Sequence, residues 1–168
     1  HMFENSGKMV ERDMLGEVRK DRYREAIPDS SEYVNYRRAL EGVRKSQWDP
    51  ENPRRFFPRD LLKGLRSDND LHEQLPKALY RYYTAIGSDL DQFHGIDAFI
   101  ECVPDPVNES LIVRVTLDVT KNPDKGQYRA DITVLVPRDG IDPKDDEYPE
   151  FLHEYIARVR SEILTKVD

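Results

Sequence analysis

Three runs of alternating apolar and polar residues lie between Ile96 and Val136, and residues that favour turns separate them. Side chains of a β-strand point alternately to its two faces, so each run places its apolar residues on one face and its polar residues on the other. The turn-forming residues 122–126 connect the second and third runs closely enough for a hairpin. The pattern therefore predicts a three-stranded antiparallel meander with one polar face, formed by 96–103, 111–121 and 128–136.

A segment with helical periodicity precedes the predicted strands in the sequence, and another follows them. Apolar residues recur at intervals of three and four in 75–86 and again in 148–167, which predicts two amphipathic helices. Residues 1–66 also show helical patterns, with Ser30 or Ser31 as the candidate cap of a second helix. The expected class is therefore α+β: N-terminal helices plus a three-stranded antiparallel meander flanked by amphipathic helices.

The length of 168 residues suits one domain with a substantial core. We expect the helical region 1–66 to pack on an α-β-β-β-α core formed by 67–168, as one folded unit. No apolar run approaches the roughly 20 residues that span a bilayer, so no membrane partner is expected. The single cysteine, Cys102, leaves no disulfide framework, and we expect a cytoplasmic protein.

Charge is distributed unevenly along the chain. The formal net charge of −7 argues against a general nucleic-acid binder, because such proteins gain affinity mainly through Lys and Arg. Residues 17–66, however, carry 13 Lys or Arg against 9 Asp or Glu, whereas 67–168 carry 11 against 21. The basic N-terminal half is therefore a candidate surface for nucleic-acid phosphates. The alternative is that its charges only solvate helix faces.

Four carboxylates lie on the predicted strands: Asp97 and Glu101 on the first, Asp118 on the second and Asp131 on the third. Alternation places them on the predicted polar face. Aspartate is disfavoured in strands, and hard cations such as Mg²⁺ or Mn²⁺ prefer carboxylate oxygens, so these side chains are candidate metal ligands. The alternative is an ordinary solvent face, on which Asp118 would pair with a neighbour such as Arg129.

A helix, three meandering strands and a helix, with Asp97 on the first strand and Asp118 deep in the second, resemble the core of the PD-(D/E)XK restriction-endonuclease-like superfamily. The likeness covers residues 75–166. It implies that Asp97 and Asp118 bind a divalent metal ion that activates water for phosphodiester hydrolysis. Glu101 and Asp131 would then be auxiliary acids and further metal ligands.

The chain departs from the family pattern at the basic residue. The family places a Lys two residues after the second acid, and Thr120 stands at that position here. The resemblance therefore implies that Lys121 or Arg129 acts as the catalytic charge stabiliser. Both residues lie close in sequence to the turn between the second and third predicted strands.

Two classes of function follow from these features. The first is a Mg²⁺- or Mn²⁺-dependent nuclease that acts on nucleic acid. The second is a non-catalytic protein-interaction domain, such as an inactive nuclease-like fold, whose acidic sheet face binds a basic protein. Geometry separates them: a nuclease needs Asp97 and Asp118 close together in a partly covered site, whereas an interaction domain spreads them on an open face.

Overall fold

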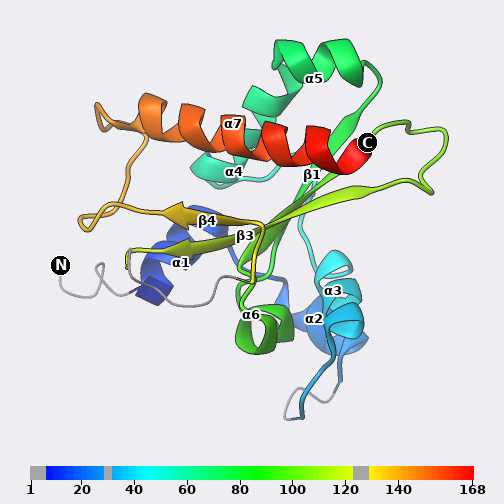
Figure 1. The fold of residues 1–168 in the computed structure, drawn as a ribbon. Coiled ribbons are helices and arrows are strands. Elements are labelled where there is room, and N and C mark those ends of the chain that lie inside the picture. The colour runs from blue at the N-terminus through cyan, green and yellow to red at the C-terminus, as the bar shows by residue number, and fades with distance from the viewer. Residues whose placement is uncertain (1–6, 29–31, 123–128) are drawn as a thin grey trace.

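Figure 1 shows the fold of the computed structural model, which describes residues 7–28, 32–122 and 129–168. A mixed sheet lies between two groups of helices, which confirms the predicted α+β class. In chain order the elements are α1 (Gly7–Leu15), α2 (Lys20–Ala26), α3 (Tyr36–Arg44), α4 (Phe56–Arg66), α5 (Asn69–Gln74), β1 (Leu79–Thr84), α6 (Asp89–His94), β2 (Ala98–Val103), β3 (Val113–Thr120), β4 (Ile132–Leu135) and α7 (Tyr148–Val167).

The sheet has four strands in the order β1-β2-β3-β4. β1 pairs antiparallel with β2, β2 pairs antiparallel with β3, and β4 pairs parallel with β3. The predicted three-stranded antiparallel meander is therefore only partly correct. Its first two strands form the expected antiparallel pair, but an additional strand precedes them and its last strand runs in the opposite direction to the one predicted.

The helix predicted over 75–86 is wrong, because β1 occupies most of this segment. Tyrosine and threonine favour strands, and β1 reads Leu-Tyr-Arg-Tyr-Tyr-Thr. Tyr82 and Tyr83 are both buried, but they belong to different hydrophobic clusters on the two sides of the sheet. A strand buried on both faces loses the simple alternation that identifies strands, so its apolar spacing also fitted a helix.

β4 runs parallel to β3 because the chain returns to the middle of β3 before the two strands pair. Thr116 N donates to Asp131 Oδ2 at 2.9 Å, and Asp131 N donates to Thr116 Oγ1 at 2.9 Å. From this anchor β4 continues in the direction of β3. The hairpin turn predicted at 122–126 lies mostly outside the described residues.

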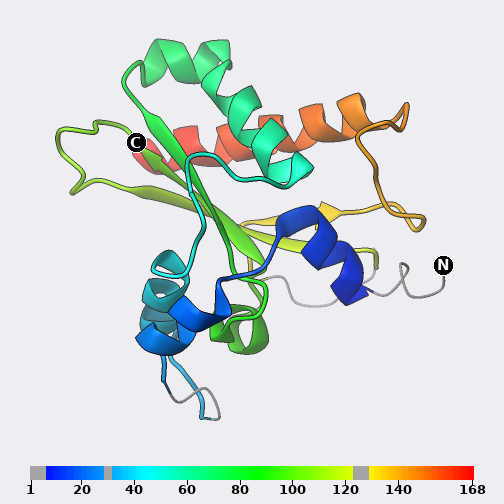
Figure 2. The same cartoon turned by 180° about the vertical axis from the view of Figure 1, so that it is seen from behind.

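Helices cover both faces of the sheet, as the two opposite views show (Figures 1 and 2). α1, α4 and α7 contribute to the hydrophobic cluster on one face, and α2, α3 and α6 to the cluster on the other. The expectation of a polar, solvent-facing sheet surface is therefore wrong. Phe99, which alternation assigns to that polar face, is fully buried among residues of the second cluster.

The bounds and caps of α7 and α3 can be compared with those predicted from the sequence. α7 has the predicted bounds, Tyr148–Val167. α3 begins at Tyr36, and its cap is Asn35, whose side chain accepts a hydrogen bond from Arg38 N at 2.9 Å. The predicted caps, Ser30 and Ser31, lie outside the described residues. Within the described part of the chain, no helix has the length and apolar character needed to cross a membrane.

Asp68 connects α5 to α7. Its side chain caps α5 by accepting a hydrogen bond from Leu71 N at 3.0 Å, and its Oδ2 accepts another from Arg160 Nη1 at 2.6 Å. Burial alone raises the pKa of Asp68, but the hydrogen bonds from Leu71 N and Arg160 outweigh it and hold the pKa below 3.8. The ionised side chain therefore stabilises the contact between the two helices.

We expect Asp68→Asn to lower the free energy of unfolding by about 1–2 kcal/mol at about pH 7, because asparagine keeps the cap but loses the charge-assisted bond to Arg160. A carboxylate with a lowered pKa stabilises the folded state above its ordinary pKa and ceases to do so as the pH falls through the folded value. The difference between variant and wild type should be complete above pH 3.8 and shrink below it. Urea unfolding at about pH 7 and about pH 3 measures the difference, and an equal gap at both values would contradict the prediction.

Candidate carboxylate site

Asp97 and Asp118 are cross-strand neighbours at one end of the β2–β3 pair. The antiparallel register aligns Ala98 with Leu117. One step further along the pair, Asp97 therefore stands opposite Asp118. Asp97 N donates to Leu117 O at 2.9 Å, and Val119 N donates to Asp97 Oδ2 at 2.8 Å. Asp97 is only 3% exposed and Asp118 only 4%, so the structure brings the two principal predicted ligands together inside the protein.

Further acidic side chains from other elements surround Asp97. Asp91 of α6 shares a side-chain hydrogen bond with it, and Glu11 of α1 adds negative charge nearby. Burial, the bond with Asp91 and the charge of Glu11 raise the pKa of Asp97 to about 10, although the Val119 N–H opposes the shift. Acidic groups therefore gather at a place where a cation would relieve their mutual repulsion.

No sequence pattern predicts that Asp91 and Glu11 lie beside Asp97. Asp91 lies in the first turn of α6, where acidic residues ordinarily stabilise a helix N-terminus, so its position carries no distinct signal. Both residues line a cavity of about 410 Å³, together with Arg12, Gly87 and Ser88. The acidic neighbours of Asp97 thus have access to solvent.

Glu101 is fully buried in β2 and is held by two arginines. Arg114 of β3 donates to Glu101 Oε2 from Nε at 2.9 Å and from Nη2 at 2.7 Å. Arg44 of α3 places its Nη2 3.3 Å from Glu101 Oε1. The Arg114 guanidinium lies 5.6 Å from the ring centroid of Phe99, and that of Arg44 lies 6.0 Å from the centroid of Tyr83. Glu101, Arg114 and Arg44 therefore form a buried ion-pair cluster.

Asp131 is engaged with β3 and α7. Its Oδ2 accepts hydrogen bonds from Thr116 N at 2.9 Å, from Thr116 Oγ1 at 3.1 Å and from Lys166 Nζ at 2.6 Å. Burial raises the pKa of Asp131, but the bonds from Lys166 and Thr116 outweigh it and hold the pKa below 3.8. The structure thus gives Asp131, like Glu101, basic partners of its own.

Arg129 and Lys121, the predicted charge stabilisers, both belong to the connection between β3 and β4. Arg129 is exposed, and its Nη1 donates to Phe93 O at 3.1 Å. Phe93 lies in α6, the helix that also carries Asp91. Lys121 is half-buried and directly follows β3, the strand that carries Asp118. Both cations therefore belong to segments adjoining the Asp97 and Asp118 end of the sheet.

The carboxylate pair suits a hydrated divalent cation. Among the described residues, no group of three or more His, Cys, Asp or Glu side chains is arranged so that it could hold a metal ion. Mg²⁺ keeps several of its waters and is usually bound through only one or two protein carboxylates. Asp97 and Asp118 supply two carboxylates on neighbouring strands, and Asp91 and Glu11 add negative charge near Asp97.

The buried ion pair yields a stability prediction. Arg114→Met should lower the free energy of unfolding by about 3–5 kcal/mol, because the buried Glu101 carboxylate loses the arginine that donates two hydrogen bonds to its Oε2. The double variant Arg114→Met/Glu101→Leu should recover most of that loss, because the buried negative charge is also removed. Chemical denaturation of both variants measures the effect. A double variant as unstable as the single one would show that the pairing with Glu101 is not the cause.

Comparison with known proteins finds no relative of this chain. No protein-family model matches the chain, and neither the curated proteins nor the solved structures contain a significant match to it.

Proposed function

We propose that the protein is a divalent-metal-dependent phosphodiesterase that cleaves nucleic acid. The observation that carries the proposal is the opposition of Asp97 and Asp118 across β2 and β3, with further acidic side chains around Asp97. Burying Asp97 beside the acidic side chains of Asp91 and Glu11 costs free energy unless a cation compensates for the negative charge. An arrangement that stability alone disfavours is expected at a functional site.

In this proposal Asp97 and Asp118 hold the ion. Mg²⁺ or Mn²⁺ bound there would lower the pKa of a coordinated water and neutralise charge that develops on the phosphate. Asp97 binds as a carboxylate and must release its proton, and Asp91 is already hydrogen-bonded to it. Arg129, anchored to Phe93 O, is the proposed charge stabiliser, and Lys121 is the second candidate.

The alternative, a domain that binds a basic protein through an acidic sheet face, receives less support. Glu101 is fully buried and Asp118 is 4% exposed. α2, α3 and α6 pack over that side of the sheet (Figure 1). A protein partner would have to displace these helices to contact Glu101 and Asp118 directly.

Metal binding and cleavage test the proposal together. Mg²⁺ or Mn²⁺ should bind the wild-type protein, and Asp118→Asn should weaken binding by about 100-fold or more, because it removes one of two charged ligands. Calorimetry measures binding, and fluorescent DNA and RNA substrates measure cleavage on the same samples. Cleavage should require the metal and be lost in both Asp97→Asn and Asp118→Asn.

Asp139→Asn is the matched control, because Asp139 is exposed in the loop after β4. It should bind metal and cleave like the wild type. Wild-type protein that neither binds the metal nor cleaves any substrate would refute the proposal. Cleavage that survives Asp118→Asn would refute the assignment of the site, since the activity would then depend on other residues.

A further inference from the structure

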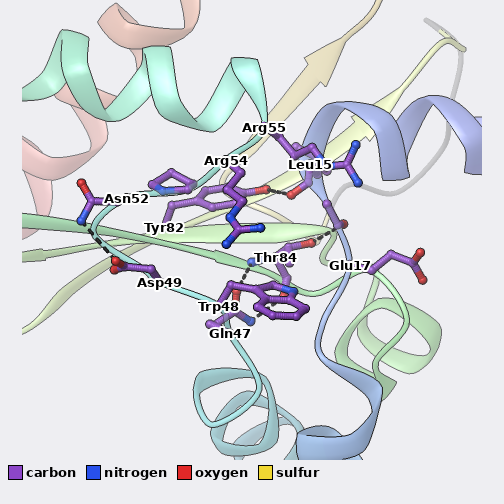
Figure 3. A pocket seen from close by; sticks show the side chains of 12 residues that line it. Leu15, Glu17, Gln47, Trp48, Asp49, Asn52, Arg54, Arg55, Tyr82 and Thr84 are labelled. Atoms are coloured by element: carbon purple, nitrogen blue, oxygen red, sulfur yellow. Dashed lines mark hydrogen bonds between the residues drawn. The ribbon is translucent and has the colours of Figure 1, made fainter.

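A second cavity, of about 550 Å³, lies along the free edge of β1 and is drawn in Figure 3. Its walls come from the α1–α2 connection, from the segment 47–55 and from β1. Figure 3 shows the Arg54 guanidinium turned toward Trp48 and Arg55 beside Leu15, with Tyr82 and Thr84 of β1 forming the floor. The cavity therefore combines an aromatic ring with two cationic side chains.

Hydrogen bonds to β1 hold the segment that carries Trp48. Gln47 Nε2 donates to Thr84 O at 2.9 Å, and Thr84 N donates to Gln47 Oε1 at 3.0 Å. Tyr82 N donates to Pro50 O at 2.8 Å. These bonds lie on both sides of Trp48 in the sequence, so the indole is presented by a fixed backbone.

Trp48 is unusually open to solvent for its size: 66% of it is exposed. The Arg19 guanidinium lies 4.5 Å from its ring centroid and that of Arg54 lies 5.7 Å from it. Arg54 lines the cavity together with Trp48, whereas Arg19 does not. A cation above an exposed ring contributes about 0.5–1 kcal/mol, whereas a stacked base contributes about 1–3 kcal/mol. A base can therefore replace Arg54 over the ring.

Two arginines of the lining are available to bind an anion. Arg54 and Arg55 are exposed, and within the described residues neither forms an ion pair. The lining also holds two acids, of which Asp49 turns toward Asn52 (Figure 3) and accepts hydrogen bonds from Glu51 N at 3.1 Å and Asn52 Nδ2 at 3.2 Å. The other acid, Glu17, lies 3.7 Å from Arg12 Nε and points away from Trp48 in Figure 3.

We infer that this cavity binds one unpaired nucleotide of a single-stranded nucleic acid. Trp48 stacks on the base, and Arg54 and Arg55 contact the phosphates on either side. The choice of a nucleic acid as the ligand rests on the proposed function, whereas the requirement for an aromatic anion comes from the cavity alone. A single strand is required because a base within a duplex is not free to stack on a side chain.

The position of the cavity suits a substrate-holding role. Thr84, in its floor, directly precedes Ala85, whose N–H donates to Asp97 O at 2.8 Å. The nucleotide site and the carboxylate pair thus adjoin the same end of β1. A strand held at Trp48 would extend from a fixed point toward Asp97, and this would align the flanking phosphate for cleavage.

Fluorescence of Trp48 tests the inference directly, because it is the only tryptophan in the chain. We would titrate the protein in EDTA with an oligodeoxythymidine of about 12 nucleotides, a length within the range that one single-strand site covers. The emission should be quenched as the base stacks. Inorganic phosphate alone should not quench it, because phosphate carries no ring.

Variants separate stacking from charge. Trp48→Ala should weaken binding by about 5- to 150-fold, measured by the anisotropy of a labelled oligonucleotide. Arg54→Gln/Arg55→Gln should reduce the slope of log K against log salt by about 1.4, because two phosphate contacts are lost from a single strand. Arg37→Gln/Arg138→Gln is the matched control, since both arginines are exposed and lie outside this cavity. This control variant should bind the oligonucleotide with the wild-type slope of log K against log salt.

The outcomes for the cavity and for the carboxylate site are distinguishable. An unquenched Trp48, or an Arg54→Gln/Arg55→Gln variant that binds with the wild-type affinity and slope, overturns the inference even if metal-dependent cleavage is present. Quenching that Arg54→Gln/Arg55→Gln weakens supports it even if cleavage is absent, in which case only the proposed nuclease activity fails. Circular dichroism of each variant confirms that the fold is intact.

Discussion

The burial of β2 on both faces constrains much of the structure around it. All six of its residues, Ala98–Val103, are buried, and Glu101 is among them. A carboxylate at such a position is stable only with close cationic partners. Arg114 of β3 and Arg44 of α3 supply them, and the stacked rings of Tyr83 and Phe99, 4.8 Å apart, lie against the same guanidinium groups. The ion-pair cluster thus fixes α3 on the sheet as well as stabilising β2.

The same sheet carries two kinds of acidic residue, which their surroundings distinguish. Glu101 and Asp131 have arginine or lysine partners, and the bonds to Asp131 lower its pKa. Asp97 instead has Asp91 and Glu11 nearby, and its pKa is raised. The lowered pKa of Asp131 means that its ionised form stabilises the fold at neutral pH, whereas the raised pKa of Asp97 means that this group weakens the fold there. This contrast is the physical reason why we propose a ligand-binding role for Asp97 and not for Glu101 or Asp131.

The cavity at Trp48 arises from the protection of a sheet edge. β1 is an outer strand, and its free N–H and C=O groups would otherwise offer an edge for aggregation. Gln47 and Pro50 cover this edge through hydrogen bonds to Thr84 and Tyr82. The covering segment holds Trp48 away from the core, so the device that protects the strand also presents an exposed aromatic ring.

The sequence by itself determined the elements whose periodicity is clean: α7, β2, β3 and the residues of β4. It also singled out Asp97 and Asp118 as candidate metal ligands, because aspartates among β-branched neighbours conflict with local strand propensity. Only the tertiary structure decided the rest. β1 resembled a helix because burial on both faces removes the alternation of a strand, and the direction of β4 depends on the long-range bond between Asp131 and Thr116. The partners of Glu101 and Asp97 come from α3, α6 and α1, and local sequence carries no record of contacts made between distant segments.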